Sequence, residues 1–357
     1  MTYRIFSTSE SAWGGMLAAI RSARTSVYLE MYIFTDDREG SEFFKVLETA
    51  AGKGVNVVAI LDVVGSWDML SGAVSRLRAA GADVVFASFF WQRLHRKTLI
   101  VDQGTARARA FIGGVNIGKA YARWRDLLVE VQGPVVETIV RSFARVYRRC
   151  GGKGAMSHVA AETKANVGAV KKAQAWFIDH GIGARRHEFR KYYEERLTHA
   201  KKSIVMVTPY FFPPRWLIAR LHQAIIRGVK VEILLPKATD HRLVDSTNRS
   251  FAAVMTELGA ACYFTGNDGK DMNHAKAMLV DGREGIIGSQ NLDPFSFNLN
   301  IEAGVFFNDP AMVADLARII DGWKAEALPA YRKRAKFKWY DLPAAFFLRV
   351  AGLVPMG

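Results

Sequence analysis

An internal repeat of helices and strands constrains the fold of this chain more than any other feature. Hydrophobic periodicity predicts a helix, a strand, a helix and a strand in succession, and the same order returns in the second half of the chain. The first series covers residues 10–24, 26–34, 41–53 and 56–63, and the second covers 188–200, 203–210, 215–227 and 230–235. A repeated helix–strand alternation is typical of an α/β fold that contains two copies of one unit.

The two copies also resemble each other in sequence. The segment GKGVNVVAILD at 52–62 matches IRGVKVEILLP at 226–236, and AAGADVVF at 79–86 matches ELGAACYF at 257–264. We therefore expect two fused α/β halves, residues 1–150 and 170–328, each a mixed sheet flanked by helices. Residues 151–169 are small, polar and basic and read as a linker, and residues 329–357 form a basic, aromatic tail.

Each half carries a His-x-Lys-x4-Asp motif in an apolar segment, LHRKTLIVD at 94–102 and NHAKAMLVD at 273–281. The motif residues are His95, Lys97 and Asp102 in the first half and His274, Lys276 and Asp281 in the second. If the segments are strands, the His and Lys side chains lie on one face and the Asp side chain on the other. The Asp is then expected to anchor the strand by hydrogen bonds rather than to act beside the His.

A glycine-containing turn and an asparagine follow each motif, GGVN at 113–116 and GSQN at 288–291. Lysines and the amide groups of Asn116 and Asn291, facing a common point, suit the oxygens of a phosphoryl group. Two histidines on opposite sides of the phosphorus permit in-line displacement, in which one attacks and the other protonates the leaving alcohol. This arrangement requires no metal and no cofactor.

A histidine in such a role needs a group that fixes its tautomer and pKa. Asp126 follows the first motif and Glu302 follows the second at nearly equivalent positions. We expect these two carboxylates to support the histidines.

Composition limits the partners and the compartment. The formal net charge of +15 indicates an anionic partner, which is a nucleic acid, a phosphorylated metabolite or an acidic membrane surface. Two cysteines exclude a disulfide scaffold. The N-terminal residues do not read as a secretory signal, and no run of apolar residues is long enough for a membrane span.

The paired motifs, with GGVN and GSQN behind them, resemble the phospholipase D superfamily over residues 10–325. The phrases GSQNLDPFSFNLNIEAGV, TPYFFPP at 208–214 and LEMYIFTDD at 29–37 are similar to bacterial cardiolipin synthases, in particular the form without N-terminal membrane spans. The first turn departs from the family pattern, because it reads GGVN where GSxN is commoner.

The resemblance implies a fused pseudo-dimer of phospholipase D-like halves with one shared site at their interface. It implies a covalent phosphatidyl-histidine intermediate, with His95 as the nucleophile and His274 as the acid. It also implies that each carboxylate supports the histidine of the other half. Glu302 would support His95, and Asp126 would support His274. The implied reaction is cardiolipin synthesis from phosphatidylglycerol, with a second phosphatidylglycerol or another lipid alcohol as acceptor.

Glu30, Tyr32, Tyr210 and Ser289 lie near strand ends or turns in the two halves and are candidates to line a substrate pocket. The tail interleaves basic and aromatic residues before an apolar segment, which suits a membrane interface. We therefore expect peripheral association with the cytoplasmic side of a bacterial cell membrane and anionic phospholipids as partners.

Two other functions fit the motifs. A phosphodiesterase that hydrolyses phospholipid or nucleic acid uses the same superfamily chemistry, although many nuclease members carry one motif per chain and dimerise. A membrane-binding scaffold that has lost catalysis is the other alternative, and the intact His, Lys and Asn sets argue against it.

Overall fold

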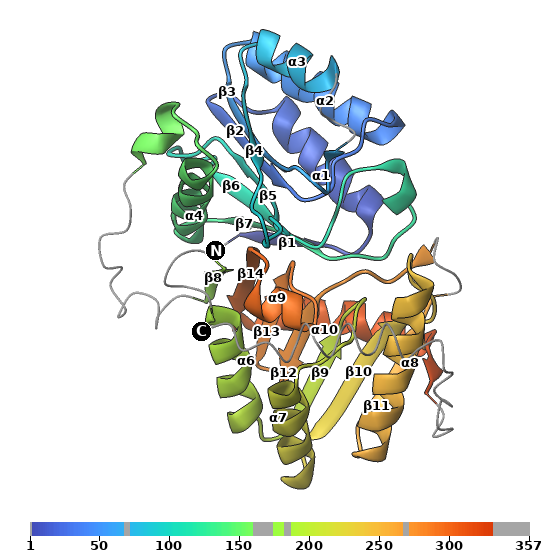
Figure 1. Cartoon of the computed structure of the whole chain (residues 1–357). Helices are drawn as coiled ribbons and strands as arrows, with labels where there is room; N and C mark the ends of the chain where they lie inside the picture. Colours follow the sequence, from blue (N-terminus) through green and yellow to red (C-terminus); the bar gives the residue numbers. More distant parts are fainter. Residues whose placement is uncertain (1, 68–71, 160–173, 182–186, 267–270, 331–357) are drawn as a thin grey trace.

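The protein folds into two similar halves, each built on one mixed sheet (Figure 1). The computed structural model describes residues 2–67, 72–159, 174–181, 187–266 and 271–330. The predicted fold class, two α/β halves with helices flanking each sheet, is confirmed. In Figure 1 the first half occupies the upper part of the view and the second half the lower part.

The first half contains a seven-stranded sheet in the order β1-β7-β6-β5-β2-β3-β4. Its elements are β1 (Tyr3–Phe6), α1 (Ser9–Arg21), β2 (Ser26–Met31), α2 (Arg38–Gly52), β3 (Asn56–Asp62), α3 (Gly72–Ala79), β4 (Asp83–Ala87), β5 (Lys97–Val101), β6 (Arg109–Gly113), η2 (Lys119–Tyr121), β7 (Leu128–Gln132), α4 (Val135–Arg149) and η3 (Ala155–His158). Strands β2, β3 and β4 are parallel, whereas β5, β6, β7 and β1 add to them as antiparallel strands.

The second half repeats this plan in an eight-stranded sheet ordered β15-β11-β10-β9-β12-β13-β14-β8. Its elements are β8 (Ala175–His180), α6 (Glu188–His199), β9 (Ser203–Val207), α7 (Arg215–Ile226), β10 (Lys230–Pro236), α8 (Arg242–Glu257), β11 (Ala261–Thr265), β12 (Ala277–Val280), β13 (Glu284–Gly288), α9 (Pro294–Asn298), β14 (Glu302–Phe307), α10 (Pro310–Ala325) and β15 (Leu328–Pro329). Strand β8 pairs with β14 as β1 pairs with β7, so the two sheets correspond strand by strand apart from the short β15.

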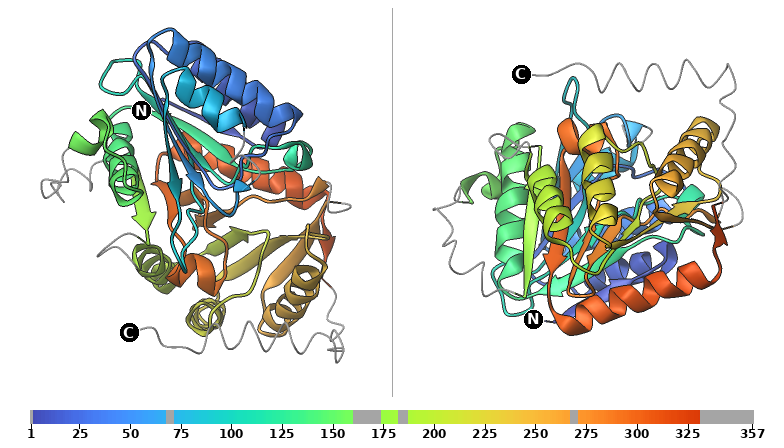
Figure 2. Two further views of the ribbon diagram at one scale, coloured as in Figure 1. Left: turned by 45° about the horizontal axis from the view of Figure 1, so that its top comes forward. Right: turned by 90° about the horizontal axis from the view of Figure 1, so that it is seen from below.

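Apolar side chains form a core on the outer face of each sheet and a third core between the sheets. The first sheet packs its outer face on α1, α2 and α3, and the second packs its outer face on α6, α7 and α8. The central core joins both sheets and includes Phe143 of α4 and Leu316 of α10. Helix α4 contacts β8 of the second half, and α10 contacts β1 of the first, so the last helix of each half reaches the other (Figure 2). The halves therefore share one interior.

The strand directions bring both motifs to one edge of the molecule. Strand β5 runs antiparallel to β2, with Lys97 opposite Met31, so its first residue adjoins the carboxyl end of β2. Strand β12 meets β9 in the same way, with Ala277 opposite Val207. We call this side the catalytic edge: it holds the carboxyl ends of β2, β3, β4, β9, β10 and β11 and the amino ends of β5 and β12.

Each motif aspartate directly follows its strand and adopts the same unusual backbone conformation. Asp102 and Asp281 have φ of 54° and 55°, in the left-handed region that few residues other than glycine adopt. The Asp102 carboxylate accepts hydrogen bonds from the backbone N–H groups of Arg24 and Thr25, at 2.7 and 2.8 Å. The Asp281 carboxylate accepts them in the same manner from residues 201–203. Each aspartate thus ties the end of its strand to the start of the neighbouring one.

Three details differ from the sequence-based expectations. Strands β2 and β9 end at Met31 and Val207, earlier than predicted. Both motif histidines precede their strands, because the backbone N–H of His95 donates to Ile301 and that of His274 to Arg125, both in the opposite half. The expected linker, 151–169, contains the short 3-10 helix η3, whose Met156 is buried, whereas residues 160–169 lie outside the described residues. The tail beyond residue 330 lies outside them as well.

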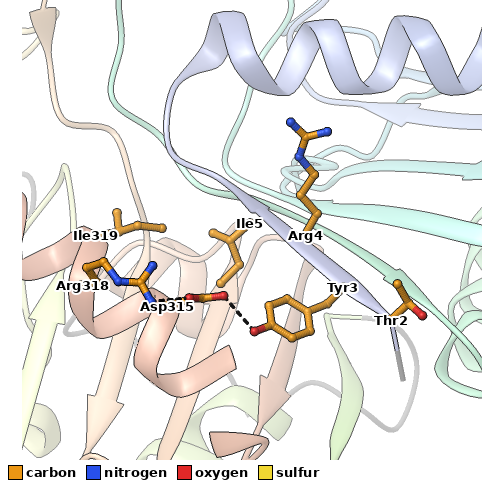
Figure 3. Close-up of a pocket in the computed structure, with 7 residues that line it drawn as sticks. All are labelled: Thr2, Tyr3, Arg4, Ile5, Asp315, Arg318 and Ile319. Atoms are coloured by element: carbon orange, nitrogen blue, oxygen red, sulfur yellow. Dashed lines mark hydrogen bonds and ion pairs between the residues drawn. The ribbon is translucent and has the colours of Figure 1, made fainter. Parts of the chain in front are cut away.

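A cavity of about 550 Å³ opens between β1 and α10, where the two halves meet (Figure 3). The Tyr3 hydroxyl donates to the Asp315 carboxylate at 2.8 Å, and Arg318 pairs with the same carboxylate at 2.7 Å. Neither motif contributes a side chain to its lining. These contacts join β1 of the first half to α10 of the second.

Candidate active site

His95 is held by a carboxylate from the other half. Its Nδ1 lies 3.0 Å from both carboxylate oxygens of Glu302, a fully buried residue on β14. The hydroxyls of Ser289 and Ser296 also donate to Glu302. Burial alone raises the pKa of Glu302, but His95, Lys97 and the Ser289 hydroxyl together hold that pKa below its usual value. Glu302 is therefore an ionised, fixed partner for the His95 imidazole.

His274 has the reciprocal arrangement. Its Nδ1 lies 2.7 Å from Asp126, which is buried and belongs to the first half. The Asp126 carboxylate also accepts a hydrogen bond from the N–H of Leu127 at 2.7 Å. Burial raises the pKa of Asp126 to about 6, against the lowering effect of Lys276. The crosswise pairing is the one that the family resemblance implies.

The two supporting carboxylates differ because the turns behind the motifs differ. Ser289 in the second half donates to Glu302, whereas the matching position in the first half is Gly114. A Cβ atom at Gly114 would lie 2.3 Å from Oδ1 of Asp126 and 3.0 Å from its Cγ. The glycine is thus needed to admit the shorter carboxylate, which explains the departure from the commoner GSxN pattern.

Two buried lysines accompany the histidines. Lys97 Nζ donates to the backbone carbonyl of His95 at 2.7 Å and lies 4.8 Å from the centre of the Tyr32 ring. Lys276 Nζ lies 2.9 Å from both ring nitrogens of His274 and also donates to the backbone carbonyl of that residue. Burial lowers the pKa of Lys97 to about 7, with a further contribution from Lys276, and lowers the pKa of Lys276 to about 8.

The lysines and the histidines influence one another across the interface. Burial lowers the pKa of both imidazoles, and the charges of the two lysines lower it further. An anion bound between the lysines would relieve this repulsion and raise the pKa of both imidazoles. The arrangement is therefore suited to bind a monoanion such as a phosphodiester.

The two motif asparagines are buried, at 4% exposure each. Among the described residues, the side-chain oxygens of Asn116 and Asn291 have no hydrogen-bond partner. The N–H of Asn291 donates to Ser296, and the carbonyl of Asn116 accepts from the Trp13 indole, so both backbones are fixed. Asp102 and Asp281, at the far ends of their strands, bind backbone N–H groups as described above and hold the strands in place.

The four candidate pocket residues lie in different surroundings. The Tyr32 ring lies edge-on to His95, with centroids 4.8 Å apart, and the Tyr210 ring is 6.1 Å from His274. Ser289 is fully buried and orients Glu302. Glu30, in contrast, does not lie beside the histidines. It is fully buried and pairs with Arg96 at 3.1 Å, because its side chain points into the core between the sheets.

Several residues at this site were not predicted from the sequence. The Trp124 ring lies 4.8 Å from His274, Asp62 accepts a hydrogen bond from the N–H of Leu94, and Asp240 accepts one from the Tyr210 hydroxyl. Asp62 ends the parallel strand β3, and Asp240 follows the parallel strand β10, at the carboxyl ends where binding residues of α/β sheets gather. Their position at strand ends is the sequence feature that could have predicted Asp62 and Asp240. For Trp124 the only such feature is that it lies two residues before Asp126 in the sequence.

Two features are absent from the described part of the chain. Within those residues, no group of three or more His, Cys, Asp or Glu side chains is arranged to hold a metal ion. Among the described helices, none has both the length and the apolar character needed to cross a bilayer.

Curated relatives of this chain are cardiolipin synthases. A probable cardiolipin synthase of Bacillus subtilis, YwiE, is 28% identical over 331 residues, which are 88% of this chain and 64% of that protein. The cardiolipin synthase of Halalkalibacterium halodurans is 29% identical over 362 residues, which are 94% of this chain and 69% of that protein. The chain thus spans about two thirds of the length of these relatives.

Solved structures share the fold. The phosphatidylserine synthase of Haemophilus influenzae superposes with a TM-score of 0.75 at 15% identity, covering 98% of this chain and 93% of that one. The polyphosphate kinase of Porphyromonas gingivalis superposes with a TM-score of 0.64 at 13% identity, covering 98% of this chain and 53% of that one. These identities support the fold alone.

A family model described as "Cardiolipin synthase, PLD-like domain" matches residues 16–149 and 193–323, one segment in each half. The two segments together make up well over half of the chain and contain both His-x-Lys-x4-Asp motifs with their supporting carboxylates. This chain belongs to the cardiolipin synthase family with phospholipase D-like domains.

Proposed function

We propose that this chain is a phosphatidyltransferase that makes cardiolipin from phosphatidylglycerol through a covalent phosphatidyl-histidine. The observation that carries the proposal is the crosswise pairing of His95 with Glu302 and of His274 with Asp126. Each carboxylate occupies Nδ1, which leaves Nε2 as the reactive atom of each ring. The names of the curated relatives support the same reaction class.

In the first step, Nε2 of neutral His95 attacks the phosphorus of phosphatidylglycerol, and the bond from phosphorus to the glycerol headgroup oxygen breaks. Protonated His274 gives its Nε2 proton to that oxygen, so glycerol leaves as the neutral alcohol. In the second step, His274 takes a proton from a hydroxyl of a second phosphatidylglycerol. That oxygen attacks the phosphorus, the bond from phosphorus to nitrogen breaks, and cardiolipin forms.

The choice of His95 as nucleophile has one structural support besides the family resemblance. The phosphatidyl-histidine carries a positive imidazolium that must persist until the acceptor arrives. Glu302, with a lowered pKa and two serine donors, is a persistent anion beside that ring. Lys97, Lys276, Asn116 and Asn291 would hold the phosphoryl oxygens as negative charge develops on them.

The function is tested with vesicles of phosphatidylglycerol that carries a labelled glycerol headgroup. The expected products are cardiolipin and free glycerol in equal amounts, with label lost from the donor. Phosphatidic acid as the sole product would make the protein a hydrolase. Cleavage of DNA in the presence of a chelator, with no new lipid, would make it a nuclease.

We expect a bell-shaped dependence of kcat/KM on pH. Below pH about 6, Asp126 becomes protonated and no longer stabilises the His274 imidazolium, so the rate falls. Above pH about 7 to 8, Lys97 and then Lys276 lose their positive charge, so the rate falls again. The measurement is kcat/KM between pH 5 and 9. In Lys97→Arg, which stays charged, the alkaline limb is expected to move toward the value of Lys276, and an unmoved limb would contradict the assignment.

Gly114→Ser is expected to lower the transfer rate about 100-fold, because the added side chain displaces Asp126 from His274. The matched change in the other half is Ser289→Ala, which removes one of the two serine donors to Glu302 but adds no atoms. It is expected to lower the rate less than about tenfold. Initial rates of cardiolipin formation measure both, and equal losses in the two variants would contradict the steric explanation.

For location, the proposal is peripheral association with the cytoplasmic face of a bacterial membrane, where phosphatidylglycerol is available. The net charge of +15 favours an anionic lipid surface.

A further inference from the structure

Several large apolar side chains of the first half are exposed at the catalytic edge. Val64 and Trp67, at 48% and 72% exposure, follow β3, and Phe90 and Trp91, at 86% and 75%, follow β4. The Phe90 and Trp91 rings meet edge to face, with centroids 4.9 Å apart. Single exposed apolar residues are ordinary on protein surfaces, but two adjacent strand ends carrying three exposed aromatic rings form a concentrated feature.

Hydrogen bonds anchor the loops that carry these rings to other segments of the fold. The Ser66 hydroxyl, next to Trp67, donates to the carbonyl of Tyr32, whose ring lies against His95. The Gln92 amide, next to Trp91, donates to the carbonyls of Gly181 and Leu299 in the second half, at 3.1 and 2.9 Å. Phe90 and Trp91 thus stand on anchored backbone five and four residues before His95, and Trp67 stands beside a residue bonded to Tyr32.

The second half adds apolar groups at the same edge. Leu243, 60% exposed, lies in the first turn of α8, three residues after Asp240, which holds the Tyr210 hydroxyl near His274. Phe295, 39% exposed, lies on α9 beside Ser296, which donates to Glu302. We name Val64, Trp67, Phe90, Trp91, Leu243 and Phe295 the apolar rim.

Basic side chains accompany the apolar rim. Arg215 begins α7 after the carboxyl end of β9, and Lys237 and Arg242 follow the carboxyl end of β10, all three exposed. Tryptophan and phenylalanine prefer the interfacial zone of a bilayer, and lysine and arginine prefer the anionic headgroups. An edge that exposes both apolar side chains and cations thus matches an acidic lipid surface better than it matches bulk water.

We propose that the apolar rim docks on the surface of an anionic phospholipid bilayer and so turns the catalytic edge toward the lipid. The inference rests on the proposed function, since a diacyl substrate stays anchored in the membrane while its headgroup must reach buried histidines. Phe90 and Trp91, the two most exposed residues of the apolar rim, enter the interfacial zone deepest, and Trp67 and Leu243 enter it as well. Docking through this edge brings the phosphodiester to His95 and His274 without removing the acyl chains from the bilayer.

The test uses the full chain and vesicles of phosphatidylglycerol and phosphatidylcholine in equal parts. The double variant Phe90→Ser, Trp91→Ser is expected to bind these vesicles about tenfold or more weakly in cosedimentation. Ile226→Ser is the matched control, because Ile226 is also 72% exposed but ends α7 at the opposite edge. It is expected to bind like the unaltered protein.

Fluorescence at saturating vesicle concentration supplies a second measurement, which reports the depth of each tryptophan rather than the strength of binding. Vesicles containing brominated acyl chains quench tryptophans that enter the interface. Trp91→Phe keeps an apolar ring but removes the reporter, so it should bind as before and lose a large part of the quenching. The proposal is overturned if the double variant binds normally, or if Trp91→Phe and Trp67→Phe are quenched like the unaltered protein. It is also overturned if the double variant changes only the mass at sedimentation equilibrium, since the rim would then be a contact between copies of the chain.

Docking and catalysis can fail separately in this design. Vesicle binding that depends on the rim, without any new lipid, would refute the proposed transferase and leave the docking surface standing. If cardiolipin forms and the rim variants bind vesicles as tightly as the unaltered chain, the docking surface is refuted and the proposed transferase activity is supported.

Discussion

His95→Ala and His274→Ala are each expected to lower cardiolipin formation about 10⁴-fold, because each removes either the attacking atom or the proton donor. The buried carboxylate left behind, Glu302 or Asp126, cannot replace an imidazole in either role. Initial rates with phosphatidylglycerol vesicles measure the loss. His222→Ala, on the surface helix α7, is the matched control and should retain the full rate.

The two variants are expected to differ when the leaving group needs no proton. A phosphatidyl diester of p-nitrophenol releases a stable phenolate, so His274→Ala should regain a rapid burst of p-nitrophenol while His95→Ala stays inactive. A phosphorylated peptide containing residue 95 should be trapped only where His95 is present. A burst from His95→Ala instead would show that the roles of the two histidines are the other way round. An undiminished rate of either variant with phosphatidylglycerol would contradict the mechanism.

The second large effect is on stability and concerns the buried pair of Glu30 and Arg96. Arg96→Met is expected to lower the free energy of unfolding by about 3 to 5 kcal/mol, because it leaves Glu30 buried without its counter-charge. Arg96 also donates to the Ser142 hydroxyl, which in turn donates to Asp179 on β8, so the pair belongs to a polar network between the halves. Urea unfolding followed by circular dichroism measures the change.

The double variant Arg96→Met, Glu30→Leu is expected to recover most of that loss, because two apolar groups replace two buried charges. Burial raises the pKa of Glu30 to about 7 even beside Arg96. A raised folded-state pKa means that protonation of Glu30 favours the folded protein at low pH, and that this contribution is lost as the pH rises through about 7. The deficit of Arg96→Met should therefore be smaller at pH 5 than at pH 8. Equal deficits at both values, or a double variant as unstable as the single one, would contradict this account.

Much of the fold was predictable because the same order of helices and strands occurs in both halves of the sequence. Each motif segment was read as a strand, and the matching βαβ order in both halves made the pair of sheets a consistent solution. The contacts that α4 and α10 each make with a strand of the opposite half were not predictable. An amphipathic helix has an apolar face whichever sheet it covers, and nothing in its sequence says which half supplies that sheet.

The candidate site was predictable to the extent that it follows from spacing. His95, Lys97, Asn116 and Asp126 come from one half in a fixed order, and the second half repeats that order. Glu30 was misjudged because a carboxylate at a strand end reads equally well as a pocket residue and as half of a buried ion pair. Trp124 and the exposed aromatics depend on loops, whose three-dimensional course the sequence pattern does not determine.

Because each supporting carboxylate comes from the opposite half, both histidine–carboxylate pairs depend on how the two halves are aligned. Glu302 and Asp126 each serve an imidazole that belongs to the opposite sheet, so a rigid shift of one sheet against the other would disturb both acid–base pairs together. In the proposed mechanism neither histidine acts without the opposite half. A substitution in the central core that tilts one sheet would therefore impair both chemical steps while every residue that meets the phosphorus stays unchanged.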